Sequence, residues 1–218
     1  MSETPSEQSP PPSGLARWLP WAILTMIGVA AGAALYVITQ AAFQPADGGL
    51  EQFRRGSLHR LRVLETSNRA PAVTVANAAG DQVPLVQDGA RLTLVNLWAT
   101  WCAPCVAEMP TFAAAQRTYG DRGLRVTAVS VDRPQEQPQA RAFMARQAPL
   151  TFYADPTMSV FNALQPRPMG LPVTLIIDHR GRERARVVGD ADWTSPEARG
   201  LIERMLSEAG ARPANQPS

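Results

Sequence analysis

Lysine is absent from this sequence, and cysteine and histidine occur only twice each among its 218 residues. Two cysteines exclude a disulfide-rich scaffold, and with two histidines they are too few for a self-contained zinc module unless carboxylates contribute. Charged residues make up only 18 % and the formal net charge is +2. No basic surface of the kind that binds nucleic acid is therefore expected. A hydrophobic content of 45 % excludes a wholly disordered chain.

The two ends of the chain have few of the apolar residues that a folded segment needs. Residues 1–17 are rich in Ser, Glu, Gln and Pro, and residues 211–218 are polar with two prolines. Neither segment can bury enough surface to offset the entropy of ordering, so we expect a disordered head and a disordered tail. The remaining length suits one domain with appendages.

The longest uncharged run extends from Trp18 to Ala46, and residues 19–38 are almost continuously apolar. At about 1.5 Å per residue, a helix of this length crosses a hydrocarbon core of roughly 30 Å. Trp18, Trp21 and Tyr36 stand near its ends, where aromatic residues favour the membrane interface. A cleaved secretory signal has a shorter apolar core and a small-residue cleavage site, which is not evident here. We therefore predict an uncleaved single-span transmembrane anchor over residues 18–42, ahead of a cleaved signal or a buried helix.

Residues 43–69 are predicted to form a linker that ends in a short amphipathic helix, because large apolar residues recur about every three or four positions from Leu50 to Leu64. A globular domain is predicted over 70–210. Two short apolar runs around Ala79-Gly80-Asp81 indicate a hairpin. Continuous apolar runs at 92–98 and 124–131 indicate strands buried on both faces.

Further elements complete this domain. Strands are expected at 150–153, 173–177 and 184–188, and helices from the cysteines to Tyr119 and over 136–147, 155–164 and 197–209. Asp155 and Ser195 are the expected caps of the last two helices. Four arginines at alternate positions from Arg180 to Arg186 are expected to form one solvated face. Strands that alternate with helices indicate a two- or three-layer α/β domain.

The two cysteines, Cys102 and Cys105, stand where a buried strand passes into a helix. Thiols at this spacing can close a small disulfide ring and reopen it. Cys102 lies at the expected helix N-terminus, where unpaired amides and the helix dipole favour its thiolate. That thiolate would attack a partner disulfide, and Cys105 would then resolve the mixed disulfide. Pro104 stiffens the turn, and Trp101 shields one side of the pair.

Other uses of such a pair fit the sequence less well. A zinc site needs further ligands, and His59 and His179 have no ligand-like spacing to the pair. Haem attachment needs a histidine directly after Cys105, where Val106 stands. A purely structural disulfide in so small a ring contributes only about 2 kcal/mol in the chain-entropy model. We predict redox chemistry at the pair, with no metal and no cofactor beyond the disulfide of Cys102 and Cys105.

Two prolines flank this segment. Pro110 falls inside the expected helix, where proline removes a hydrogen bond and imposes a kink. Pro172 directly precedes the strand at 173–177, which makes it a candidate for a cis peptide bond that faces the cysteines, although most such bonds are trans.

The run Leu94-Val95-Asn96-Leu97-Trp98-Ala99-Thr100-Trp101-Cys102-Ala103-Pro104-Cys105, followed by Glu108-Met109-Pro110, resembles the membrane-anchored thioredoxin-like proteins of bacteria, the TlpA and ResA group. The resemblance covers about residues 70–208 and leans towards the TlpA branch at 161–172 and 189–193. It implies a thioredoxin fold with an N-terminal β-hairpin and a central αβ insertion, preceded by one transmembrane helix. It also implies thiol-disulfide reductase activity.

The resemblance further implies roles and partners. Cys102 is the nucleophile, Cys105 the resolving thiol and Pro172 a cis-proline that helps to bind substrate, together with Leu171 before it. Trp101 and Pro104 complete the expected substrate contacts. The expected partners are proteins with exposed disulfides, either apocytochromes c or copper-site assembly proteins, and a membrane reductase of the DsbD or CcdA type as electron donor. We expect a monomer, anchored in the bacterial inner membrane with its catalytic domain on the periplasmic side.

The sequence also departs from ordinary thioredoxins. Asn96 replaces the buried aspartate that they keep beneath the cysteines, and an amide cannot accept the proton. Glu108 lies three residues after Cys105 and hence on the same helix face. It resembles the active-site glutamate of the ResA group and is the candidate for assisting proton transfer at Cys105. Without the resemblance, the simpler interpretation of Glu108 would be a carboxylate that faces solvent on its helix. Val173 after Pro172 departs from the Gly-x-Pro-Glu form of the cytochrome c maturation member CcmG.

Local charge predicts a reductant. An oxidising pair needs a stabilised thiolate, for example through a cation between the cysteines. Ala103 and Pro104 carry no charge, and an ionised Glu108 would oppose thiolate formation.

Two other functions on the same fold stay open. A Sco-type copper-binding assembly module needs a wider cysteine spacing and a third ligand, for which only His59 and His179 are available. A peroxiredoxin-like peroxidase needs a Thr-x-x-Cys setting, whereas Thr100 stands two residues before Cys102.

Charge and redox arguments give opposite orientations. Arg17 precedes the predicted anchor, and four arginines follow it between Arg54 and Arg62. The positive-inside rule would then place the domain in the cytoplasm, but long domains translocate largely regardless of such charges. We give the redox-active cysteines the greater weight and predict that the domain lies outside.

Overall fold

The computed structural model describes residues 23–33, 36, 49–64 and 68–210. The chain divides into two compact units, Met1–Pro45 and Ala46–Ser218. In the first unit residues 23–33 are helical, and no helix among the described residues is both long and apolar enough to cross a membrane. The rest of the predicted anchor at 18–42, the predicted head at 1–17 and the predicted tail at 211–218 lie outside the described residues.

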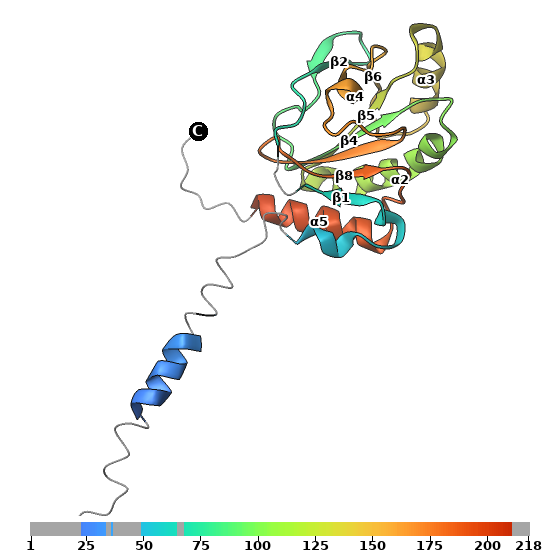
Figure 1. Ribbon diagram of the computed structural model, residues 1–218. Coiled ribbons are helices and arrows are strands. Elements are labelled where there is room, and N and C mark those ends of the chain that lie inside the picture. Colours follow the sequence, from blue (N-terminus) through green and yellow to red (C-terminus); the bar gives the residue numbers. More distant parts are fainter. Residues whose placement is uncertain (1–22, 34–35, 37–48, 65–67, 211–218) are drawn as a thin grey trace, which may run out of the picture. The chain divides into compact units, whose positions relative to one another are not determined.

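In the part of the second unit that is described, eight strands form one sheet in the order β1-β8-β7-β4-β5-β6-β2-β3 (Figure 1). The strands are β1 (Leu61–Val63), β2 (Thr74–Ala76), β3 (Gln82–Pro84), β4 (Leu92–Trp98), β5 (Leu124–Ser130), β6 (Tyr153–Ala154), β7 (Val173–Asp178) and β8 (Glu183–Val188). The α-helices are α2 (Ala103–Tyr119), α3 (Gln137–Met144), α4 (Ser159–Ala163) and α5 (Pro196–Gly210). Short 3₁₀ helices are η1 (Leu50–Phe53), η2 (Gly56–Leu58), η3 (Gly120–Arg122) and η4 (Pro134–Glu136).

Strand β4 is the centre of the sheet because all seven of its residues are buried. It pairs in parallel with β5 and antiparallel with β7. Its alternate side chains enter two different apolar clusters. Leu94 and Trp98 pack in one cluster with residues of α2 and α5, whereas Val95 and Leu97 pack in the other with residues of α4 and the β2–β3 hairpin. The domain therefore has three layers, and β4 carries the cysteine segment out of its core.

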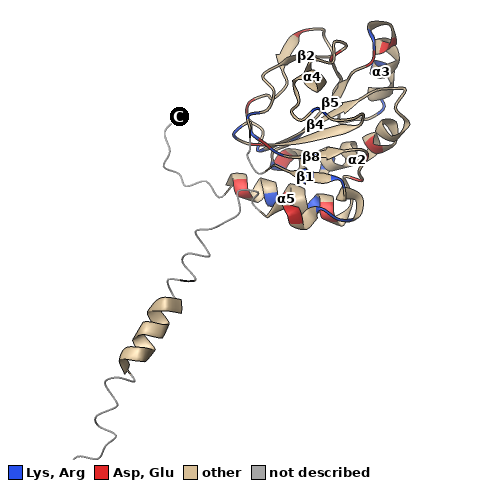
Figure 2. Ribbon diagram, in the orientation of Figure 1, with Lys and Arg blue, Asp and Glu red and all other residues tan. Residues whose placement is uncertain are grey.

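Helix α5 shows the usual division of a surface helix. Leu201, Ile202 and Met205 are buried, whereas acidic and basic residues of both signs lie along the rest of the helix (Figure 2). Ser195 accepts a hydrogen bond from the Ala198 N–H at 3.3 Å, which confirms it as the predicted cap.

The predicted hairpin and central insertion are both present. Strands β2 and β3 pair antiparallel, and the Asn77 side chain closes their turn by accepting bonds from the N–H groups of Ala79 and Asp81. The hairpin joins the sheet where Ala76 pairs with Ala154 of β6, and β6 pairs in parallel with β5. Between β5 and β7 lie α3, β6 and α4, of which α3 and β6 fit the predicted αβ insertion.

Helix α4 is shorter than predicted, since it begins at Ser159 and not at Asp155. Met158 has φ +55° and interrupts the helical path. The Asp155 carboxylate still serves the helix, because it accepts a bond from the Val160 N–H at 2.8 Å.

Residues 49–64 are packed against the domain and do not form the predicted linker with an amphipathic helix. Residues 43–48 and 65–67 of the predicted linker lie outside the described residues. In place of that helix, residues 49–64 form η1, η2 and the edge strand β1, which pairs antiparallel with β8. Leu50, Leu58 and Leu61 are at most 1 % exposed. Ser57 bonds Ser195 Oγ at 3.1 Å, and its N–H donates to Glu197. The leucine spacing reflects burial against α5, for which a helical period is not required.

The predicted solvated arginine face is also wrong at two positions. The Arg184 side chain is only 15 % exposed and pairs with Glu208 at 3.2 Å. Arg186 is 4 % exposed and forms a buried ion pair with Glu183, with Nε 2.7 Å from Oε1. Its guanidinium also donates to the Pro166 carbonyl at 2.8 Å. Arginine at this position is satisfied inside the fold, so strand alternation alone misplaces it.

Candidate active site

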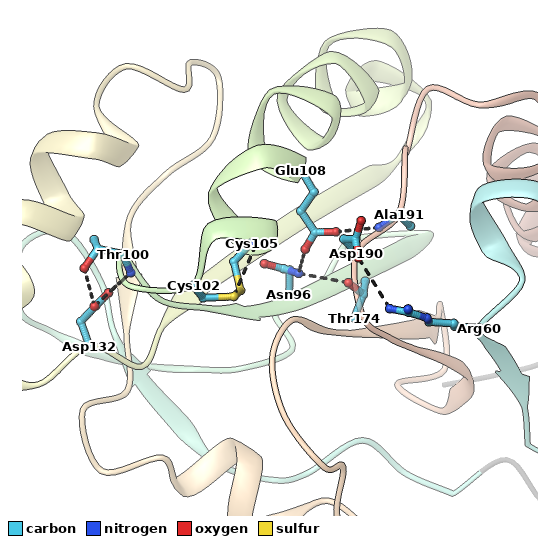
Figure 3. Close-up of a disulfide and its surroundings, with 10 residues drawn as sticks. All are labelled: Arg60, Asn96, Thr100, Cys102, Cys105, Glu108, Asp132, Thr174, Asp190 and Ala191. Atoms are coloured by element: carbon cyan, nitrogen blue, oxygen red, sulfur yellow. Dashed lines mark hydrogen bonds and ion pairs between the residues drawn. A yellow bond between two sulfur atoms is a disulfide. The ribbon is translucent and has the colours of Figure 1, made fainter.

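The cysteine pair lies where β4 passes through a tight turn into α2 (Figure 3). The Cys102 N–H donates to the Ala99 carbonyl at 3.2 Å, and Cys102 is the N-cap of α2. Cys102 and Cys105 form a disulfide with their Cα atoms 5.2 Å apart. Cys102 is 7 % exposed and Cys105 is 0 % exposed. Cys102 is thus the more exposed of the two, and its predicted role as the attacking thiol stays a prediction.

The helix start acts on Cys102 directly. The Cys105 N–H points at the Cys102 sulfur at 3.3 Å, and Pro104 occupies the first turn. An unpaired helical amide aimed at sulfur favours the negative charge of a thiolate. This contact supports Cys102 as the nucleophile.

Of the predicted substrate contacts, Trp101 and Pro104 flank the cysteines in the chain, and Leu171 and Pro172 directly precede β7. Trp101 is 64 % exposed. The Leu171–Pro172 peptide bond is cis, as predicted, and Leu171 packs against the cluster that contains both cysteines. Because Val173 pairs with Leu97 near the end of β4, the cis bond lies at the same edge of the sheet as the disulfide. Two further cis bonds, Ala148–Pro149 and Gln165–Pro166, had no signal in the sequence reading.

Glu108 is buried, not solvent-facing, and stands one turn after Cys105 on the buried side of α2. Its Oε1 accepts a bond from Asn96 Nδ2 at 2.7 Å, and its Oε2 accepts one from the Ala191 N–H at 3.1 Å (Figure 3). Burial raises the pKa of Glu108 from 4.5 to about 8, although both hydrogen bonds favour the charged form and the charge of Asp190 opposes it. The carboxyl is therefore largely neutral at pH 7.

This neutrality corrects one step of the sequence argument. An ionised Glu108 was expected to oppose the thiolate by like charge, and a protonated carboxyl does not. A pKa of about 8 instead places Glu108 close to that of an ordinary cysteine thiol, about 8.5. A carboxyl with such a pKa can both take up and release a proton near neutral pH.

Asn96, the residue that replaces the buried aspartate of thioredoxins, lies on β4 and is 0 % exposed. Its Nδ2 donates to Glu108 and, at 3.1 Å, to Thr174 Oγ1 of β7. The amide thus holds the carboxyl in place where thioredoxins carry an acid of their own. Pro110 lies inside α2, which nevertheless continues to Tyr119.

A second buried carboxylate, Asp132, was missed by the sequence reading. It follows β5 and is 0 % exposed. Its oxygens accept bonds from the Thr100 N–H at 3.0 Å and the Thr100 hydroxyl at 2.7 Å (Figure 3). They also accept a bond from the Ser130 hydroxyl at 2.8 Å. Asp132 thereby fixes the turn that carries Trp101 and Cys102. One signal in the sequence could have identified Asp132. It is an acidic residue at the end of a buried strand, and that strand pairs in parallel with β4.

These contacts bear on the two alternative functions. The Thr100 hydroxyl is bonded to Asp132, so it points into this network and not to Cys102. His179 follows Asp178, which pairs with Leu92 at the opposite end of β4 from the cysteines. Among the residues described, no group of three His, Cys, Asp or Glu side chains is placed to hold a metal ion.

Comparison with known proteins gives a consistent result. Residues 66–185 match the model of the AhpC/TSA family. The chain is 33 % identical over 119 residues to the thioredoxin-like protein YneN of Bacillus subtilis, covering 54 % of this chain and 68 % of that one. It is 30 % identical over 128 residues to the thiol-disulfide oxidoreductase ResA of Geobacillus thermodenitrificans, covering 58 % and 71 %.

Solved structures agree on the fold. A crystal structure from Chlorobium tepidum, assigned as the thiol:disulfide interchange protein DsbE, has a TM-score of 0.54 and 25 % identity, covering 67 % of this chain and 98 % of that one. A thiol:disulfide interchange protein from Bacteroides sp. has a TM-score of 0.53 at 21 % identity, covering 65 % and 90 %.

Proposed function

The chain belongs to the AhpC/TSA family and is a thiol-disulfide oxidoreductase, and from that premise we propose that it reduces disulfides in partner proteins. The observation that carries this proposal is the asymmetric pair at the start of α2. Cys102 is 7 % exposed and its sulfur accepts the Cys105 N–H, whereas Cys105 is fully buried one turn before Glu108, a carboxyl whose pKa burial raises to about 8.

The reaction begins from the reduced pair. The Cys102 thiolate attacks one sulfur of the partner disulfide, and the other partner sulfur leaves as a thiolate. The Cys105 thiol then gives its proton to Glu108 in its ionised form, which is the minor form at pH 7, and attacks the Cys102 sulfur. The mixed disulfide breaks, the second partner sulfur leaves, and the pair closes as the disulfide seen here. Two electrons pass to the partner, so each cycle needs an external donor of two electrons.

We further propose where this chemistry occurs and with whom. The uncharged run at 18–42 is long enough to anchor the chain in the inner membrane, and a dithiol–disulfide cycle suits the periplasmic side. A membrane reductase of the DsbD or CcdA type is the proposed donor. Apocytochromes c or copper-site assembly proteins are the proposed acceptors, and the Val173 departure favours the second class. The proposed working form is a monomer.

The serine variants of the two cysteines test the reaction order. Cys105→Ser should trap a stable mixed disulfide with a disulfide-bonded protein substrate, because nothing resolves it. Cys102→Ser should trap none, since its remaining thiol is fully buried. Non-reducing electrophoresis with mass spectrometry reads both. A mixed disulfide through Cys105 in the Cys102→Ser protein would contradict the assignment.

A further inference from the structure

The loop that joins β8 to α5, residues 189–195, supplies a hydrogen bond to the buried carboxyl of Glu108. The Ala191 N–H donates to Glu108 Oε2 at 3.1 Å, and Ala191 itself is 7 % exposed (Figure 3). Two residues earlier, the Gly189 N–H donates to the Pro172 carbonyl at 2.8 Å. One loop therefore contacts both the cis-proline and the carboxyl that takes part in the proposed proton transfer.

The two neighbours of Ala191 in the chain, Asp190 and Asp192, are exposed and are held from outside by the segment that leads into β1. Arg60 Nη1 lies 3.6 Å from Asp190 Oδ1 (Figure 3). Ser57 Oγ donates to the Asp192 carbonyl at 3.1 Å and accepts a bond from the Asp192 N–H, also at 3.1 Å. The loop is thus held on both sides of the residue whose N–H points at the carboxyl.

This segment and the loop are in close contact. The Arg60 side chain passes over Gly189, because a Cβ placed on that glycine would lie 3.0 Å from Arg60 Cδ. Gly189 also has φ +109°, a conformation that residues with a Cβ rarely adopt. The Ser57 N–H donates to Glu197 in the first turn of α5, which lies next to the segment (Figure 1). Glycine at position 189 therefore leaves room for the arginine that holds the loop.

The two contacts of the segment act on Glu108 in the same direction. The Ala191 N–H favours the ionised carboxylate, and the charge of Asp190 opposes it. Because Arg60 is paired with Asp190, its positive charge offsets part of that opposition. The pair is exposed and contributes little to stability by itself, so its effect is on the carboxyl and not on the fold.

Asp190 is the charged residue among those that act most strongly on Glu108. The others are neutral donors: the Asn96 amide from β4, and the Ala191 N–H and the Trp193 indole from the loop. Helix α2 adds the Cys105 thiol of the reduced pair, one turn before the carboxyl. The loop is therefore the element through which charge and hydrogen bonding at the carboxyl are adjusted.

We propose that Ser57 and Arg60 are positioning residues for Glu108. They hold the loop on both sides of Ala191 and so fix the N–H that the carboxyl accepts. The inference rests on the proposed function, because it assigns the two residues to the step in which Cys105 gives up its proton and closes the disulfide. The chain that follows the proposed membrane anchor thus contributes to the active site.

One coloured reagent separates the two steps of the reaction. The reduced full-length protein is mixed with a small excess of dithiobis(nitrobenzoate). Attack by Cys102 releases the first coloured thiolate at a rate that depends on reagent concentration, and closure of the pair by Cys105 releases the second at a rate that does not. Ser57→Ala and Arg60→Ala should slow the second phase at least threefold at pH 7 and leave the first within about twofold.

The pH dependence separates a positioning role from a loss of stability. Closure needs ionised Glu108, so its rate rises with pH as the carboxyl ionises. Without the Ala191 bond or the Arg60 charge the pKa of Glu108 is higher. The rise should therefore move up by about half a pH unit, which corresponds to the threefold loss at pH 7. Arg60→Lys keeps the cation and should restore the profile of the unaltered protein.

Arg54→Ala is the matched control. Arg54 forms an exposed ion pair in the same segment, but its partner at 3.1 Å is Glu51 of η1 and not a residue of the loop. This variant should leave both phases and the pH profile unchanged. Unchanged closure in both Ser57→Ala and Arg60→Ala, or an equal shift in Arg54→Ala, would overturn the positioning role alone. A Cys102→Ser protein that releases the first thiolate as fast as the unaltered chain would instead overturn the proposed function.

Discussion

Two buried carboxylates stand near the cysteine pair and are held in different ways. Glu108 receives two hydrogen bonds, and burial outweighs them, so its pKa lies at about 8. Asp132 receives bonds from both donors of Thr100 and from Ser130. The first arrangement suits a group that exchanges a proton, and the second suits a fixed acceptor that sets backbone geometry. The first arrangement supports the proposed role of Glu108 in proton transfer at Cys105, and the second fixes the Thr100 turn that precedes Cys102.

Replacing Glu108 by glutamine should change how stability depends on pH. A carboxyl whose pKa is raised in the folded state stays protonated while the unfolded chain ionises, so the folded protein loses stability as pH rises from about 4.5 to about 8. Glutamine has no such loss. Between pH 5 and pH 8, the free energy of unfolding of the oxidised glutamine variant should therefore rise by several kcal/mol relative to that of the oxidised unaltered protein, as measured by urea unfolding. Parallel pH curves for the two proteins would contradict the raised pKa.

Asp132→Asn should slow the attack by Cys102 about tenfold, because an amide cannot accept all the bonds that now fix the Thr100 turn. Asp155→Asn is the matched control, since Asp155 is also buried and also accepts a backbone N–H and a threonine hydroxyl, but serves α4. Both variants should lose about 1–3 kcal/mol of stability. Alkylation of Cys102 as a function of pH separates them. Equal losses of rate in both variants would show that Asp132 matters only for folding.

At the scale of elements, strongly patterned segments could be predicted and locally ambiguous ones could not. The strands at β4 and β5 and the helix at α2 are signalled by continuous apolar runs and by the cysteine junction, and all three are confirmed. The segment at 50–64 has helical spacing but is buried as two 3₁₀ turns and an edge strand. There, tertiary burial against α5 decided the structure, and periodicity could not reveal it. Arg186 was misplaced for the same reason, since its partner Glu183 is visible only once the strand is packed.

The catalytic site shows a similar division. Cys102, Cys105 and the cis bond before Pro172 could be predicted from local sequence and the family resemblance. Glu108 accepts a hydrogen bond from Ala191, which is 83 residues away in the chain, and Asp132 accepts one from Thr100, which is 32 residues away. Long-range contacts of this kind leave no local pattern.

The packed N-terminal segment gives a test at this scale. Leu58→Ala should lower the free energy of unfolding by about 2–5 kcal/mol, because Leu58 is fully buried and its truncation leaves a cavity. His59→Ala, at the exposed next position, should change it by less than about 0.5 kcal/mol. Chemical denaturation of the two variants measures both. A Leu58→Ala protein as stable as the unaltered chain would restore the linker interpretation.

At the scale of the whole molecule, the chain combines one redox domain with a proposed membrane anchor. The domain provides a reactive surface around one accessible sulfur, and the anchor would keep that surface close to a membrane-bound electron donor. The electrons that the domain transfers are held by the Cys102–Cys105 pair. The direction of transfer therefore depends on how strongly the pair holds its two electrons.

The reduction potential of the full-length chain tests this direction most directly. It is measured by equilibration with glutathione, with Cys102→Ser and Cys105→Ser as controls that should show no couple. The account predicts a value clearly below the glutaredoxin range of about −200 mV, because no cation between the cysteines stabilises the thiolate. A value near −120 mV, about that of DsbA, would make the protein an oxidant and contradict the proposed reductase.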